Sequence, residues 1–120
     1  MKTSNNLEIF QGLSKYQDKQ EILAAIIIQL EKDTGLDYTQ IPVDAENRIF
    51  LETLRKDLAL YLKKIGEQSQ TRFMHLIYRV DISQTKMNQL EMNVHYYHQL
   101  AEMVLNRMFQ KVITKRIIKT

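Results

Sequence analysis

Apolar residues recur at every third or fourth position over the C-terminal third of the chain. No glycine or proline occurs between Ser83 and Thr120. This spacing predicts one amphipathic helix of roughly 35 residues, on the order of 50 Å long at 1.5 Å per residue. Ser83 suits the N-cap position, and Ile82 and Met87 have the spacing of a hydrophobic staple across it. The apolar stripe consists of Met87, Leu90, Val94, Tyr97, Ala101, Val104, Leu105, Met108 and Val112.

A second apolar region, residues 22–30, is hydrophobic on nearly all sides and predicts the most buried helix. Ser14 and Gln17 have the spacing of a capping box, so we expect this helix to begin near residue 15 and to end at Gly35. The three consecutive isoleucines at 26–28 would also suit a strand. Helix-forming residues flank them and no second strand is predicted, so we favour a helix. Residues 1–13 lack periodicity and are expected to be flexible.

The middle of the chain predicts one or two further helices. A connection from Gly35 to Pro42 leads to Asp44, which suits an N-cap. The following stripe is broken at Gly66 and Ser69, after which a shorter helix is expected; residues 44–79 could instead form a single kinked helix. The first stripe contains Phe50, Leu54, Leu58, Tyr61 and Ile65, and the second contains Phe73, Leu76, Ile77 and Val80.

Together these patterns predict an all-α fold, a three- or four-helix bundle with a long C-terminal helix, in a single domain covering residues 1–120. The chain has no cysteine, which excludes disulfides and thiolate metal sites. The N-terminus lacks the features of a secretory signal, and the longest apolar run is too short to cross a membrane. We therefore expect a protein of the bacterial cytoplasm with no membrane span.

The positive charge is concentrated at the C-terminus. The net charge is +3, but the 103 residues outside the C-terminal segment 104–120 contain 12 basic and 14 acidic residues. Basic residues near a helix C-terminus are stabilised by the helix dipole. They could equally contact phosphates of nucleic acid or an anionic surface, which is the alternative functional hypothesis. The five residues are Arg107, Lys111, Lys115, Arg116 and Lys119.

Four potential metal ligands, Glu91, His95, His98 and Glu102, would share one edge of the predicted C-terminal helix. Their spacing differs from the Glu-x-x-His motif of carboxylate-bridged iron sites, and no second helix offers a matching motif. Solvated Glu–His pairs one helical turn apart explain the pattern as well. We expect no metal and no cofactor, and retain a metal-binding bundle as a distant alternative.

The sequence contains no catalytic motif. Its four serines are isolated from any nucleophile-elbow motif, and its three glycines are too far apart to form a phosphate-binding loop. We therefore predict that the protein is not an enzyme, and no small-molecule substrate is inferred.

Protein association is the leading functional hypothesis. Met92, Tyr96, Leu100 and Met103 lie off the main stripe of the predicted helix and form a candidate partner interface. Methionine side chains adapt well to partner surfaces. We therefore expect a non-enzymatic interaction or structural module that binds a protein partner or itself, as a dimer. Beyond Val112, Ile113, Ile117 and Ile118 rotate off the stripe, so the helix end is expected to project from the core.

Overall fold

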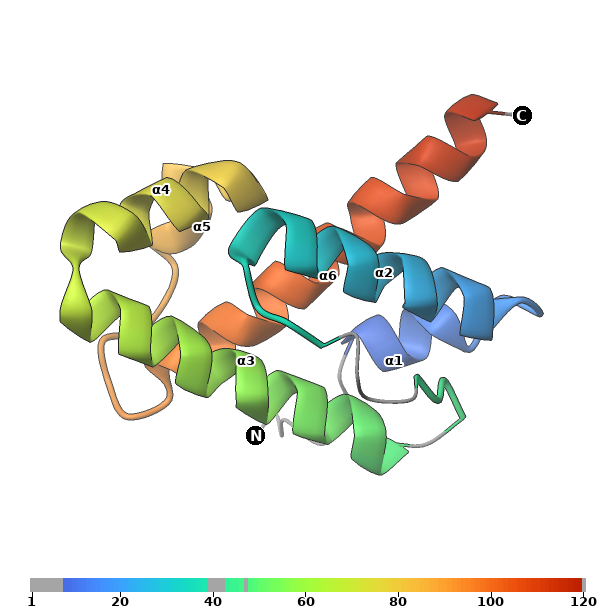
Figure 1. Ribbon diagram of the computed structural model, residues 1–120, viewed down its shortest axis with the longest axis horizontal. Helices are drawn as coiled ribbons and strands as arrows, with labels where there is room; N and C mark the ends of the chain where they lie inside the picture. The colour runs from blue at the N-terminus through green and yellow to red at the C-terminus, as the bar shows by residue number, and fades with distance from the viewer. Residues whose placement is uncertain (1–7, 39–42, 47, 120) are drawn as a thin grey trace.

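The computed structural model of the chain describes residues 8–38, 43–46 and 48–119, with side chains from residue 11 to residue 118 within these ranges. The described residues contain six α-helices and no strand, which confirms the all-α class (Figure 1). Four of the helices exceed ten residues and form the bundle. In chain order the helices are α1 (Glu8–Leu13), α2 (Lys19–Thr34), α3 (Arg48–Gln68), α4 (Gln70–Val80), α5 (Gln84–Met87) and α6 (Tyr96–Lys119).

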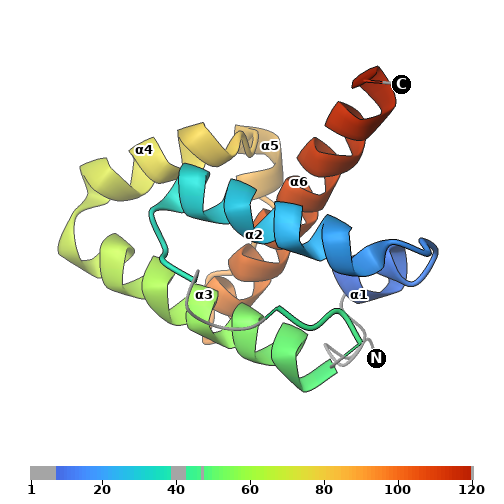
Figure 2. The ribbon, with the colours of Figure 1, turned by 45° about the vertical axis from the view of Figure 1, so that its right-hand side comes forward.

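Helix α6 lies at the centre of the arrangement and packs against α1, α2, α3 and α4. In Figures 1 and 2 it crosses behind α2, and its last turns project beyond the other helices, as expected from the rotated isoleucines. Ile117 and Ile118 on this end are 67% and 76% exposed. None of the described helices is long and apolar enough to cross a membrane.

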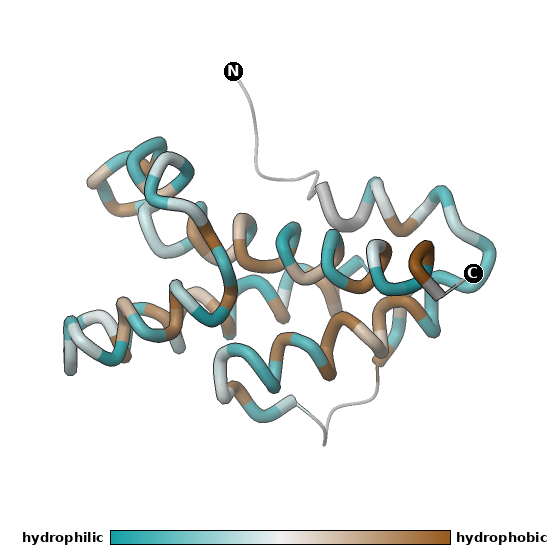
Figure 3. The backbone as a smooth tube through the Cα atoms, turned by 90° about the horizontal axis from the view of Figure 1, so that it is seen from above, coloured by the Kyte–Doolittle hydropathy of each residue, from teal (hydrophilic) through white to brown (hydrophobic). Residues whose placement is uncertain are grey.

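The core is built from one apolar face of each long helix. Helix α2 supplies Ile22, Leu23, Ile26 and Leu30, which are fully buried, so the helix lies in the core as predicted. Ile28 is nevertheless 65% exposed, so the isoleucine run is not buried on all sides. Figure 3 shows that hydrophobic and hydrophilic positions alternate along the helices, as amphipathic packing requires. The other fully buried side chains include Leu54, Leu58, Leu62, Val80, Leu100, Ala101, Val104 and Met108.

The N-terminal segment differs from expectation. Residues 8–13 form α1, which packs on α6, and Leu13 is 1% exposed; residues 1–7 lie outside the described part. Helix α2 begins at Lys19, not near residue 15. The predicted capping box is wrong, because the Ser14 hydroxyl donates a hydrogen bond to the Gln11 carbonyl at 2.7 Å. The hydroxyl thus closes the turn after α1.

Three predicted helix ends are confirmed by their geometry. Gly35 ends α2 in the left-handed region, with φ of 84°. Ser69 and Ser83 cap α4 and α5, and their hydroxyls accept hydrogen bonds from the Arg72 and Lys86 amides, each at 3.2 Å. The cap at Ser69 separates α3 from α4, so the alternative of one kinked helix over residues 44–79 is wrong.

Helix α3 begins at Arg48, later than the Asp44 cap predicts. The Asp44 carboxylate instead accepts a hydrogen bond from the Glu46 amide at 3.0 Å, which forms a turn before the helix. Asp44 therefore organises the entry to α3 without capping it.

The prediction of one continuous helix from residue 83 to residue 120 is wrong. Helix α5 is a single turn, residues 88–95 are not helical, and α6 begins at Tyr96. Asn93 holds this break: its side-chain oxygen accepts a hydrogen bond from the His95 amide at 2.8 Å, and its carbonyl accepts one from the Tyr96 amide at 3.1 Å. Asparagine competes with helix formation in this way because its short side chain reaches nearby backbone groups.

Candidate interaction groove

A groove of about 990 Å³ runs between α3, the first turns of α4 and the segment 92–98. We call it the α3–loop groove. It forms because the break before α6 turns the chain back toward α3. Its lining residues are Lys56, Ala59, Leu60, Lys63, Gln70, Phe73, Met92, Asn93, Val94, Tyr96, Tyr97 and His98.

Three apolar side chains of the α3–loop groove are largely exposed to solvent. Leu60, Met92 and Val94 are 67%, 86% and 88% exposed. Two of them, Met92 and Val94, flank Asn93 in the non-helical segment, so the turn that Asn93 stabilises also presents them to solvent. Clustered exposed apolar side chains of this kind are typical of sites that bind another molecule.

Aromatic rings give the groove a rigid wall. The rings of Phe73 and Tyr97 meet edge to face at 6.3 Å, and those of Tyr96 and Tyr97 at 5.0 Å. A Cβ on Gly66 would lie 2.5 Å from the Tyr97 hydroxyl oxygen, so glycine lets this ring pack closely on α3. The wall therefore joins α3, α4 and α6.

The groove carries positive charge on one side only. Lys56 and Lys63 line it, and no aspartate or glutamate is among its lining residues. Neither lysine forms an ion pair with an acidic residue in the described ranges. Lys56, Leu60 and Lys63 are spaced four and three residues apart, which places them along one ridge of α3.

The titratable groups beside the apolar side chains favour their neutral forms. Burial raises the pKa of Tyr96 and of Tyr97, so both hydroxyls stay protonated. Burial, followed by the nearby Arg55 guanidinium, lowers the pKa of His98. The imidazole therefore favours its neutral form at pH 7, whereas the two lysines that line the groove are charged.

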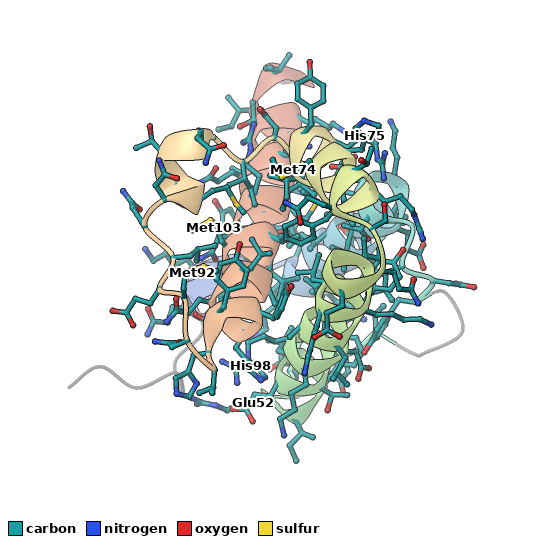
Figure 4. All side chains as sticks on the ribbon, turned by 90° about the vertical axis from the view of Figure 1, so that its left-hand side faces the viewer. Glu52, Met74, His75, Met92, His98 and Met103 are labelled. Carbon is teal, nitrogen blue, oxygen red and sulfur yellow. The ribbon has the colours of Figure 1, made fainter. Side chains whose placement is uncertain are left out.

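The four predicted interface residues do not form one surface. Met92 and Tyr96 line the α3–loop groove, whereas Met103 lies in a second depression and Leu100 is 0% exposed. Figure 4 shows Met92, in the segment before α6, apart from Met103 on α6, with His98 lower and toward α3. Including Leu100 was an error, because the core-facing side of α6 is wider than the predicted stripe: Leu100 is buried next to the stripe residues Ala101 and Val104.

The second depression, of about 630 Å³, lies between α5 and α6 and is mainly polar. Arg107 lies at its edge. The Arg107 guanidinium pairs with the Asp81 carboxylate at 2.6 Å and donates a hydrogen bond to the Asp81 carbonyl at 3.0 Å. This contact lowers the pKa of the Asp81 carboxyl. The lining residues are Asp81, Ile82, Ser83, Lys86, Gln89, Leu90, Gln99, Glu102, Met103, Asn106, Arg107 and Gln110.

The basic residues predicted to contact a polyanion bind groups of the protein itself. Lys111 bonds to the Asp33 carboxylate at 2.7 Å, and Lys115 donates to the Gln29 side-chain oxygen at 2.7 Å. Arg116 pairs with Asp18 at 2.6 Å, as Arg107 does with Asp81. These contacts tie α6 to α2 and to the end of α4. The Lys119 side chain lies outside the described part of the structure.

The expected arrangement of metal ligands also depends on the continuous helix. Glu91 and His95 belong to the non-helical segment, so they do not share a helix edge with His98 and Glu102. Glu102 instead pairs with Arg55 of α3 at 2.6 Å. Among the residues that the structure describes, no group of three or more histidine, aspartate or glutamate side chains could hold a metal ion.

Sequence reasoning missed Leu60, Lys56 and Lys63, and assigned Val94 to the core stripe. Leu60 does leave a signal, because it falls outside the apolar stripe of its helix. The sequence contains no signal for the role of Lys56 and Lys63, because this role depends on which segment folds against α3.

Comparisons with models of known protein families, with characterised proteins and with solved structures find no significant match for this chain. Function must therefore be inferred from the geometry and chemistry of the surface.

Proposed function

We propose that the protein is a non-enzymatic helical interaction module that binds an apolar segment of a partner protein in the α3–loop groove. The observation that carries the proposal is the exposure of Leu60, Met92 and Val94 around one concave, aromatic-walled surface. An amphipathic helix laid in such a groove buries its apolar face against these side chains.

The energetic case rests on apolar burial. Covering exposed apolar surface contributes roughly 25 cal/mol per Å², and flexible methionines such as Met92 adapt to the shape of a partner. The Phe73 and Tyr97 rings are already packed, so binding does not have to order them. The groove thus combines a preformed wall with adaptable residues at its rim.

The surroundings of the groove support binding better than catalysis. Its lining residues include no carboxylate, serine or cysteine, so its one imidazole, that of His98, has no acidic orienting group within the lining. We include a cytosolic location in the same proposal, because the chain has no cysteine to form disulfides.

A peptide titration followed by nuclear magnetic resonance tests the proposal. The probe is a designed 18-residue amphipathic helix with a leucine-rich face and an uncharged glutamine face. We expect saturable shifts of the Leu60, Met92 and Val94 resonances, and loss of binding in the triple variant Leu60→Gln, Met92→Gln, Val94→Gln.

The matched control replaces three exposed hydrophobic residues outside the groove: Ile28→Gln, Tyr78→Gln and Ile118→Gln. Circular dichroism verifies that both variants are folded. Equal loss of binding in the two variants, or no binding of the peptide to the wild type, would refute the proposed groove.

A further inference from the structure

We propose that the partner of the α3–loop groove is an acidic amphipathic helix whose carboxylates pair with Lys56 and Lys63. This inference rests on the proposed function and adds the chemistry of the partner. It is carried by the ridge of α3, on which the two lysines bracket the exposed Leu60.

The spacing along this ridge defines what the partner must present. Lys56 and Lys63 are seven residues apart, which is about 10 Å along a helix at 1.5 Å per residue. A partner helix with two acidic residues seven positions apart, and apolar residues between them, would match both the lysines and Leu60. The apolar residues would contact Met92 and Val94 on the opposite side.

These lysines contrast with the basic residues of α6. Lys111 and Lys115 are held by Asp33 and Gln29 within the fold. On α3, the acidic residue one turn before Lys56, Glu52, pairs with Arg48 at 3.5 Å. Glu67, one turn after Lys63, lies near Tyr97 at the end of the groove but forms no ion pair with Lys63. Within the described ranges Lys56 and Lys63 thus lie beside exposed apolar surface without an acidic partner. Charges placed in this way select partners of opposite sign.

The same charges disfavour a second copy of the chain as the occupant. The projecting end of α6 offers exposed Ile117 and Ile118, but Lys115 and Arg116 directly precede them. Inserting this end into the groove would bring like charges together, which is unfavourable. An acidic partner helix avoids this repulsion.

Three peptides with the same leucine-rich face test the inference. Their polar faces carry glutamate, glutamine or lysine, and fluorescence anisotropy measures each affinity at 50 mM and 500 mM NaCl. We expect the glutamate peptide to bind about tenfold more tightly than the glutamine peptide at low salt, and this preference to shrink at high salt.

Charge reversal supplies the decisive comparison. The wild type should bind the glutamate peptide more tightly than the lysine peptide. In the variant Lys56→Glu, Lys63→Glu we expect this order of affinities to be reversed. The matched control, Lys32→Glu, Lys64→Glu, makes the same change in net charge at exposed residues outside the groove and should preserve the wild-type order.

The outcomes separate the two proposals. Equal binding of all three peptides, or the same effect of both charge-reversal variants, would overturn the acidic partner and leave the groove intact. Binding of none would overturn both. Concentration-dependent dimerisation that the groove variant abolishes would show a second copy as the occupant. Binding to phosphatidylglycerol vesicles through Lys56 and Lys63, without preference among the peptides, would show an anionic surface; either result overturns the inference.

Discussion

Replacing Lys111 with methionine should destabilise the fold, whereas the same replacement of an exposed lysine should have little effect. The Lys111 ammonium lies 2.7 Å from the Asp33 carboxylate and donates to the Arg79 carbonyl at 3.2 Å. The two charged side chains are only 18% and 11% exposed. Methionine keeps the unbranched apolar stem and removes the charge, so the loss reports mainly on the ion pair.

The expected magnitude follows from the burial of the pair. Removing one member of a fully buried ion pair costs about 3–5 kcal/mol, and the partial exposure here reduces this to about 2–4 kcal/mol. Asp33 would retain a hydrogen bond from the Gln29 side chain at 3.1 Å. Asp33→Asn should cost less, about 1–2 kcal/mol, because the freed lysine can extend into solvent.

Urea unfolding followed by circular dichroism measures these free energies. The double variant Asp33→Asn, Lys111→Met should be less destabilised than the sum of the single variants by about 1–2 kcal/mol, because neither charge remains unpaired. Lys64→Met provides the control at an exposed lysine. A loss for Lys111→Met within about 0.5 kcal/mol of this control would refute the structural role and restore Lys111 as a free cation for polyanion contact.

Three further measurements test the core, a turn and the titration of the site. Leu100→Ala should lower the free energy of unfolding by about 2–5 kcal/mol in urea, whereas Met92→Ala should stay within about 0.5 kcal/mol; similar losses would contradict their assigned burial. Gly35→Ala should cost about 1 kcal/mol or more, seen as a lower melting temperature, because φ is 84°. The pKa of His98 is lowered in the folded state, so below its ordinary value of 6.5 the unfolded chain binds a proton more readily than the folded one. The contribution of His98 to the free energy of unfolding is therefore present above pH 6.5 and is lost as the pH falls below this value. Wild type should therefore lose more stability than His98→Gln between pH 7.5 and pH 5, and parallel curves would contradict this.

The parts of the fold that follow from sequence are those governed by neighbouring residues. Gly35, Ser69 and Ser83 end or begin helices through contacts within a few positions, so their types and places suffice to predict them. The burial of most residues between 22 and 30 likewise follows from their composition, whereas the composition does not indicate that Ile28 is 65% exposed. These local signals were enough to establish the helical class and the boundary between α3 and α4.

The partners of the basic residues could not be predicted in this way. Lys111 and Asp33 are 78 residues apart in the chain, and Arg116 and Asp18 are 98 apart. A cluster of cations in sequence therefore looks the same whether tertiary structure satisfies it or leaves it exposed. Only the packing of α6 against α2 and the end of α4 shows that four of the five bind groups within the fold.

The break before α6 connects the main error in the predicted fold to the candidate site. Apolar periodicity favoured a helix through residues 88–95, but Asn93 binds the backbone of its own turn and begins α6 at Tyr96. In a continuous helix, Met92 and Val94 would lie on different faces, because residues two positions apart are rotated by about 200° around the helix axis. In the turn they both line the α3–loop groove. A local departure from helical geometry thus gathers two exposed apolar side chains beside Leu60, and departures of this kind are expected at functional sites.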